Sequence, residues 1–80
     1  MIDADAARGM VREVFAEMVG HSVQDSEPIV SSGLIDSLSV VRLITRLEEK
    51  LTIKLLAGHM QPEDFDTVDL TMETLEREAR

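Results

Sequence analysis

The chain contains no cysteine, tryptophan or tyrosine, and its only aromatic residues are Phe15 and Phe65. Without cysteine it can form neither a disulfide nor a thiolate metal site. The two histidines, His21 and His59, are far apart and lack the spacing of metal ligands, so we expect no metal site. A chain of 80 residues, 44% of them apolar, must then be stabilised by aliphatic packing, which is typical of a small helical bundle.

Basic residues are also few: 8 lysines and arginines stand against 16 acidic residues, giving a formal net charge of −8. Because nucleic-acid binding requires lysine and arginine to neutralise phosphates, we expect no nucleic-acid partner. The negative charge favours solubility, and it could also steer a basic protein partner. There is no signal-peptide pattern and no stretch of membrane-spanning length. We therefore expect residues 1–80 to form a single, monomeric, cytoplasmic domain.

The first segment has the pattern of an amphipathic helix, with Asp3 or Asp5 as N-cap and Gly20 at its end. The residues at three- and four-residue spacing predict its buried face: Ala7, Met10, Val11, Val14, Phe15 and Met18. The charged residues fall on the opposite face: Arg8, Arg12, Glu13 and Glu17.

Residues 20–36 show no sustained periodicity and are rich in serine. A connection of this length is unusual in a compact domain and is commonly either functional or disordered. Four apolar residues favour a loop that packs against the helices: Ile29, Val30, Leu34 and Ile35. We expect this loop to bring Asp36 and Ser37 to one end of the bundle.

The segment Gly33-Leu34-Ile35-Asp36-Ser37-Leu38 predicts the start of a second helix. Asp36 is expected to be its N-cap, accepting a hydrogen bond from the N–H group of Leu38 or Ser39. Ser37 is then the first helical residue, exposed at the positive end of the helix macrodipole, where an attached anion is favoured. Taken alone, however, Asp36-Ser37-Leu38 favours an ordinary serine of a capping turn, because capping signals of this kind are common.

This second helix is predicted to run from Ser37 to about Leu51, with Ile35 and Val40 forming a hydrophobic staple at its start. Its apolar stripe is predicted to comprise Leu38, Val41, Ile44, Leu47 and Leu51, widened by Val40 and Leu43. The residues expected in solvent are Arg42, Arg46, Glu49 and Lys50.

Residues 51–55 alternate as a strand would but have no partner strand, so we expect an extended connector with Ile53 and Leu55 buried. Pro62 suits the first position of a short helix, with Glu63 and Asp64 in its first turn and Phe65 in the core. Asp66 or Thr67 would cap a last helix with a buried stripe at Val68, Met72, Leu75 and Ala79, and with Arg77 and Arg80 near its end. The sequence thus predicts an all-α bundle of three longer helices and one short helix, with a long first loop.

We predict no catalytic residues. A nucleophilic serine needs a base that is oriented by a third group, and Ser37 has no such base nearby in the sequence. His21 and His59 could approach it only through the fold, and neither has an evident orienting partner. The acidic residues are scattered, and no phosphate-binding glycine loop is present.

With these features the chain resembles the acyl and peptidyl carrier proteins over nearly its whole length. The resemblance includes the opening helix and the long loop, and it rests most on residues 33–38. The other matching positions are Val41, Leu43-Ile44 and Leu47-Glu48-Glu49 of the second helix, the Pro62-Glu63-Asp64-Phe65 turn and Thr67-Val68.

The resemblance implies that Ser37 receives a covalent 4′-phosphopantetheine arm from coenzyme A. A separate magnesium-dependent phosphopantetheinyl transferase would attach it, and Asp36 would help that enzyme act. The thiol at the end of the arm would carry an acyl or aminoacyl group as a thioester and deliver it to acyl-accepting enzymes. The chain itself would not be an enzyme.

The second helix also indicates a subclass. Fatty acid carriers of this family typically have acidic residues along its partner-facing side, where this chain has Ser39, Arg42 and Arg46. Because such a charge change alters which partners bind, the pattern resembles stand-alone aminoacyl carriers of the D-alanyl or peptidyl type, which work with adenylating enzymes. The predicted partner-binding residues are Leu38, Val41, Arg42 and Arg46. The alternatives are a fatty acid or polyketide carrier, and an unmodified helical interaction domain.

Overall fold

The computed structural model describes residues 3–55 and 60–78, which form three α-helices and one short 3-10 helix. The elements in chain order are α1 (Ala4–Val19), α2 (Ser37–Leu51), η2 (Pro62–Phe65) and α3 (Val68–Glu78). No strand occurs within these two ranges. The predicted all-α bundle of three longer helices, one short helix and a long first loop is confirmed.

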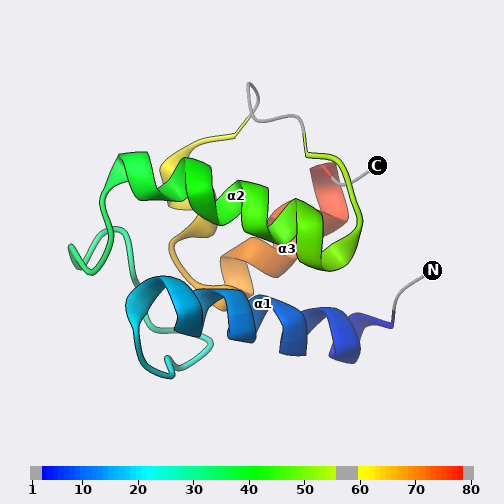
Figure 1. Ribbon diagram of the computed structural model, residues 1–80, viewed down its shortest axis with the longest axis horizontal. Helices are drawn as coiled ribbons and strands as arrows, with labels where there is room; N and C mark the ends of the chain where they lie inside the picture. Colours follow the sequence, from blue (N-terminus) through cyan, green and yellow to red (C-terminus); the bar gives the residue numbers. More distant parts are fainter. Residues whose placement is uncertain (1–2, 56–59, 79–80) are drawn as a thin grey trace.

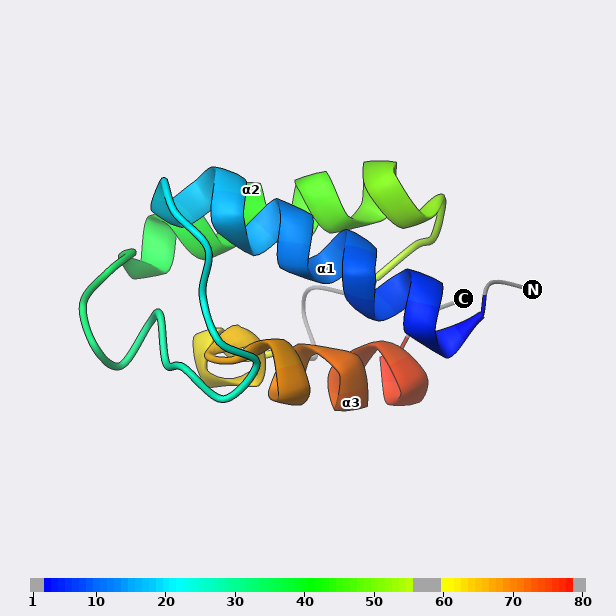
Figure 2. The same ribbon diagram turned by 90° about the horizontal axis from the view of Figure 1, so that it is seen from below.

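The helices surround one apolar core. α1 and α2 run antiparallel (Figure 1), and α1 contacts both α2 and α3. α3 lies behind α1 and α2 in Figure 1, and in the view of Figure 2 α2 and α3 lie on opposite sides of α1. The short helix η2 contacts both α2 and α3. The largest fully buried apolar side chains come from every element and from the first loop: Phe15, Phe65, Ile29, Leu43, Leu47, Val11, Val14 and Val68. None of the described helices has the length and apolar character needed to cross a membrane.

α1 begins after Asp3, which occupies the N-cap position without a hydrogen bond from its side chain. Asp3 is thus one of the two predicted N-caps, although its carboxylate makes no capping hydrogen bond, and its main-chain carbonyl accepts the first helical hydrogen bond, from the N–H group of Ala7, at 2.8 Å. Gly20 ends the helix as predicted, because its left-handed conformation (φ 97°) lets its N–H group bond to the carbonyl of Ala16. The predicted apolar face of α1 supplies four buried residues: Ala7, Val11, Val14 and Phe15.

α2 has the predicted bounds, and its buried face agrees with the predicted apolar set only in part. The buried residues are Val40, Leu43, Leu47 and Leu51. Leu38 and Val41, which were expected in the stripe, have 83% and 64% of their surface exposed. The prediction failed at these two residues because the apolar residues of α2 cover two adjacent sides of the helix. Only one of these sides packs against α1 and η2.

Thr52 caps the end of α2 in the left-handed region, and the extended connector follows it. Leu55 is buried, as predicted, and its N–H group donates to Glu48 Oε2 at 2.9 Å. Ile53 packs against the core while partly exposed, which is less burial than predicted.

The short helix η2 and α3 follow the predicted pattern, with Phe65 fully buried. Of the two candidate caps for α3, Thr67 is the one used, because its Oγ1 accepts the N–H group of Leu70 at 2.9 Å. Val68 and Met72 are buried, Leu75 packs against the core, and Ala79 and Arg80 lie outside the described residues. The sequence did not predict two buried threonines, Thr71 and Thr74, on the same face of α3.

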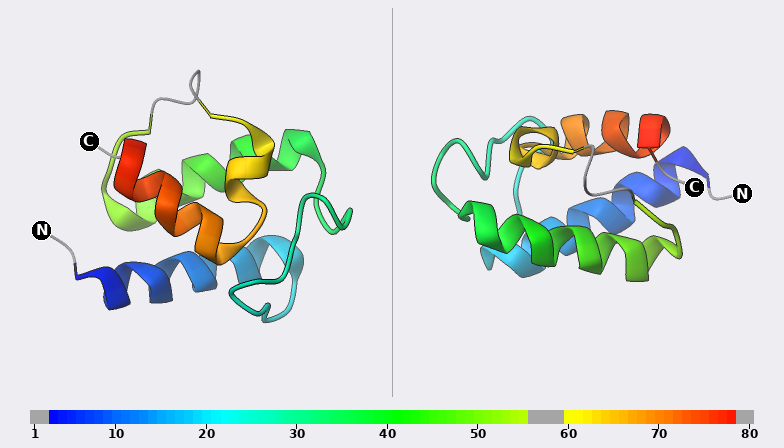
Figure 3. Two further views of the ribbon diagram at one scale, coloured as in Figure 1. Left: turned by 180° about the vertical axis from the view of Figure 1, so that it is seen from behind. Right: turned by 90° about the horizontal axis from the view of Figure 1, so that it is seen from above.

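The first loop, residues 20–36, packs against the bundle as expected. Figure 3 shows it passing beside the beginning of α3 before it returns to α2. Asp25 holds its first half, because the carboxylate accepts hydrogen bonds from Arg8 and from both Arg12 Nε and Nη2, at 2.8–2.9 Å. The N–H group of Asp69, in α3, donates to the Asp25 carbonyl at 3.1 Å. Arg8 and Arg12 thus join α1 to the loop instead of standing free in solvent.

Candidate functional site

Asp36 closes the first turn of α2 as predicted. Its backbone is extended (φ −97°, ψ 174°), and its Oδ1 accepts the N–H group of Ser39 at 2.8 Å. Of the two expected donors, Ser39 is the one used. The hydrogen bond from the Ser39 backbone holds the pKa of Asp36 below its ordinary value. Asp36 therefore stays charged at neutral pH beside the next residue, Ser37.

Ser37 is the first residue of α2 and is exposed. Within the described residues its hydroxyl group takes part in no hydrogen bond, whereas Ser31 Oγ donates to Asp66 and Ser32 Oγ donates to the Pro28 carbonyl, each at 2.7 Å. Ser39 is partly buried. Ser37 thus has a free hydroxyl at the positive end of α2, where a negatively charged group is stabilised.

Three apolar residues close to Ser37 in the chain are exposed. Leu38 is 83% exposed and Val41, one turn along α2, is 64% exposed. Leu34, before the cap, is 45% exposed. The packing that buries Val40 and Leu43 turns Leu38 and Val41 outward. Exposed apolar residues of this kind are common where another molecule binds.

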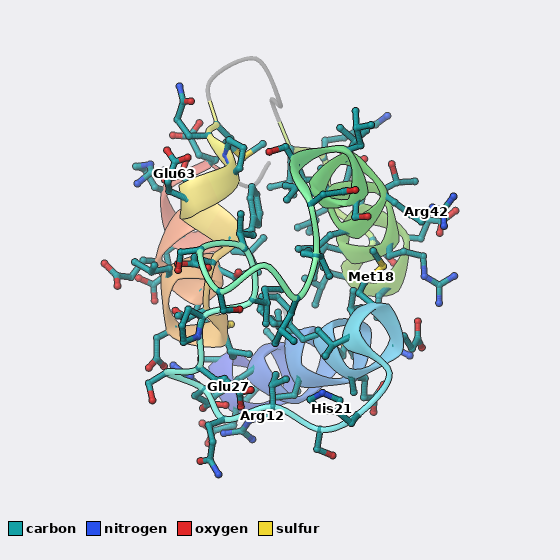
Figure 4. All side chains as sticks on the ribbon, turned by 90° about the vertical axis from the view of Figure 1, so that its left-hand side faces the viewer. Arg12, Met18, His21, Glu27, Arg42 and Glu63 are labelled. Atoms are coloured by element: carbon teal, nitrogen blue, oxygen red, sulfur yellow. The ribbon has the colours of Figure 1, made fainter. Side chains whose placement is uncertain are left out.

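The two arginines of the predicted partner face have different surroundings. Arg42 projects outward from α2 (Figure 4) and belongs to none of the ion pairs between described residues. Arg46, one turn later, is paired with Glu17 of α1, which raises the pKa of Arg46. Lys50 is likewise paired with Glu13 at 2.8 Å. Arg46 and Lys50 are exposed, as predicted, and their ion pairs, which the sequence did not predict, link α2 to α1.

The arrangement offers no catalytic partner for Ser37 among the described residues. His21 is exposed in the first loop, with its Nδ1 3.1 Å from the Ser22 carbonyl oxygen, and His59 lies outside the described ranges. The described histidine, aspartate and glutamate residues form no group of three that could hold a metal ion. Two open hollows, of about 490 and 450 Å³, do not include Ser37 in their linings.

An exposed serine with a free hydroxyl group, directly after an aspartate N-cap, thus distinguishes the start of α2. The sequence model of the family described as "phosphopantetheine attachment site" matches residues 10–75. The chain belongs to this family. The family resemblance that the sequence suggested is confirmed. No curated protein and no solved structure matches the chain closely enough to add to this assignment.

Membership of the phosphopantetheine attachment family fixes the cofactor and the general role. The chain carries a covalently attached 4′-phosphopantetheine, and domains of this kind interact with phosphopantetheinyl transferases and acyl-handling enzymes. The free Ser37 hydroxyl fits this group, since its ester bond would place a phosphate beside the N–H groups that begin α2.

Proposed function

We propose that this chain is a stand-alone aminoacyl or peptidyl carrier in which Ser37 bears the phosphopantetheine arm. The thiol of the arm holds the cargo as a thioester, an adenylating enzyme loads it, and acyl-accepting enzymes receive it. In this proposal the chain is monomeric, cytoplasmic and not itself an enzyme, and residues 1–80 act as one carrier domain.

The main evidence for attachment at Ser37 is its free, exposed hydroxyl group, directly after Asp36 in the chain. Attachment forms a phosphodiester at Ser37 Oγ, the hydroxyl proton is lost, and the nucleotide part of coenzyme A leaves. A transferase must reach this oxygen without unfolding the carrier. Ser31 and Ser32 use their hydroxyl groups within the loop, so they are poorer substrates than Ser37.

The aminoacyl subclass is supported by charge on α2. Arg42 is exposed and takes part in no ion pair between described residues; it directly follows the exposed Val41 and lies one turn after the exposed Leu38. A basic residue at this place favours a partner with acidic groups and disfavours a partner that binds acidic carriers. The fatty acid or polyketide carrier is the second candidate, because its partners would also use the apolar residues beside Ser37. The family assignment argues against the third, an unmodified interaction domain.

Intact-mass measurement tests the attachment site. The protein is incubated with coenzyme A and a promiscuous phosphopantetheinyl transferase, and we expect the mass of one arm to be added to wild type and none to Ser37→Ala. The variants Ser32→Ala and Ser39→Ala are matched controls and should be modified as wild type is. Ser37→Ala should keep the helical circular dichroism spectrum, because exposed substitutions usually change stability by less than about 0.5 kcal/mol. An arm found on Ser31, Ser32 or Ser39 would contradict the proposal.

A further inference from the structure

Asp66, between η2 and α3, is bound to the first loop by four hydrogen bonds. Its Oδ1 accepts the N–H groups of Val30 and Ser31 at 2.8 and 2.9 Å, and its Oδ2 accepts the Ser31 hydroxyl at 2.7 Å. Its main-chain carbonyl accepts the N–H group of Ile29 at 2.8 Å. A single residue thus fixes three consecutive residues of the loop.

These three residues are linked in turn to the segment that ends in Ser37. The N–H group of Ile35 donates to the carbonyl of Ile29 at 2.9 Å, which closes residues 29–35 into a compact loop. Within it, Gly33 adopts the left-handed conformation (φ 84°) and donates to the Val30 carbonyl at 3.0 Å. Ile35 is buried, and the next residue, Asp36, caps α2.

The charge of Asp66 strengthens this attachment. Burial by itself raises the pKa of Asp66, but the hydrogen bonds from Ser31 and Val30 outweigh burial and keep the pKa below its ordinary value. The carboxylate is therefore ionised at neutral pH, and hydrogen bonds to an ionised acceptor are stronger than those between neutral groups.

We propose that Asp66 is a positioning residue for the modification of Ser37: by holding residues 29–31, it keeps the segment leading to Asp36 and Ser37 in one geometry. This inference rests on the proposed attachment at Ser37. The side chain of Asp66 bonds to the loop and not to Ser37, so in this proposal it acts through the loop. When this restraint is lost, a smaller fraction of the carrier has the geometry that the transferase binds.

Such a loss predicts a particular kinetic pattern. When only a fraction of a protein is competent to bind, its apparent affinity falls in proportion, while the complex that does form is unchanged. Removing the Asp66 carboxylate should therefore raise the KM of the transferase for the carrier and leave kcat nearly unaltered.

The test compares Asp66→Ala with Asp66→Asn and Thr67→Ala in steady-state assays of a promiscuous transferase with coenzyme A. For Asp66→Ala we expect KM for the carrier to rise on the order of 10-fold, with kcat within about twofold of wild type. Asp66→Asn keeps an oxygen acceptor for Val30 and Ser31, so it should restore most of the lost affinity. Thr67→Ala removes the cap of α3 without touching the loop, so it should lower stability and leave KM unchanged.

Hydrogen exchange gives a second readout that does not depend on modification. The amides of Val30, Ser31 and Ile35 should lose protection in Asp66→Ala and keep it in Thr67→Ala. If Asp66→Ala does not fold, Ser31→Ala replaces it, with a KM increase of about two- to threefold because one of the four hydrogen bonds is lost.

An unchanged KM in the folded variant, or an equal rise in Thr67→Ala, would overturn the role of Asp66. Unchanged protection of the loop amides would overturn it as well. Failure of the proposed attachment site is recognised separately, since it would appear as modification of Ser37→Ala, whatever the Asp66 variants do.

Discussion

Asp36 brings together a structural contact and a charge at the start of α2. Its Oδ1 satisfies the N–H group of Ser39, one of the amides that a helix leaves free at its beginning. The same carboxylate stays ionised next to Ser37, because that hydrogen bond favours the charged form. Two substitutions separate the contribution of the cap from that of the charge.

Asp36→Ala should lower the midpoint of thermal unfolding by roughly 4–8 °C, the size expected when a small domain loses an N-cap. Asp36→Asn should unfold close to the wild-type temperature, since asparagine is an equally good N-cap. The asparagine variant should nevertheless be modified several times more slowly, because it lacks the charge beside Ser37. The measurements are thermal unfolding by circular dichroism and the rate of arm attachment. Modification of Asp36→Asn at the wild-type rate would show that the charge plays no part.

At the residue scale, the sequence predicts contacts between near neighbours and misses those between distant residues. The cap at Asp36 was predictable because donor and acceptor are three residues apart. The role of Asp66 was not, because Val30 and Ser31 precede it by 36 and 35 residues. The sequence offered Asp66 as a helix cap, and only the fold shows that its carboxylate faces the loop.

At the scale of the element, α2 presents one buried and one exposed apolar face. The sequence predicted its bounds correctly, because Asp36 and the apolar period mark both ends. It wrongly placed Leu38 and Val41 in the buried stripe, since which apolar residues are covered depends on where α1 and η2 pack. The exposed face carries Leu38, Val41 and Arg42 beside Ser37.

Arg42→Glu tests whether this exposed face selects the partner. With a cognate adenylating enzyme we expect loading of the carrier to slow about 3- to 10-fold at low salt, mainly through slower association, and the difference to shrink as salt screens the charges. The helix should survive, because arginine and glutamate have similar helix propensities and the introduced carboxylate would lie one turn before Arg46. The measurement is the loading rate against salt concentration.

Lys54→Glu is the matched control for this experiment, because it makes the same charge change beyond the other end of α2 and should leave loading nearly unaltered. Enzymes of fatty acid synthesis should use the wild-type carrier poorly. The aminoacyl subclass would be contradicted if fatty acid synthesis enzymes used the wild-type carrier efficiently and adenylating enzymes loaded Arg42→Glu at the normal rate. That result would favour the fatty acid or polyketide carrier.

At the scale of the whole molecule, ion pairs join segments that are distant in the sequence. Arg8 contacts Asp25 of the first loop and Asp69 of α3, while Arg46 and Lys50 link α2 to α1. The hydrogen bond from Arg12, followed by that from Arg8, lowers the pKa of Asp25 from an ordinary 3.8 to about 2. Asp36 and Asp66 have pKa values shifted in the same direction.

These shifts predict how stability depends on pH. A carboxyl group with a lower pKa in the folded state stabilises it fully above the unfolded pKa of 3.8, and this contribution is lost as pH falls through the folded pKa of about 2. The urea midpoint should therefore fall between about pH 4 and pH 2. Asp25→Asn should make this decline shallower, whereas Glu76→Gln, at an exposed residue outside the described ion pairs, should not. Equal slopes for wild type and Asp25→Asn would contradict the prediction.

The absence of cysteine, together with the exposed position of Ser37, has a consequence for redox chemistry. The thiol of the arm is the only thiol in these 80 residues, so oxidation cannot close a disulfide within them. When the arm carries no cargo, oxidation can instead form a disulfide bond between its thiol and that of a second carrier or of a small molecule. An arm that carries cargo is protected, because its sulfur is acylated. When oxidation is carried out without small thiols, the proportion of disulfide-linked dimer on a non-reducing gel therefore rises with the fraction of carrier that is empty.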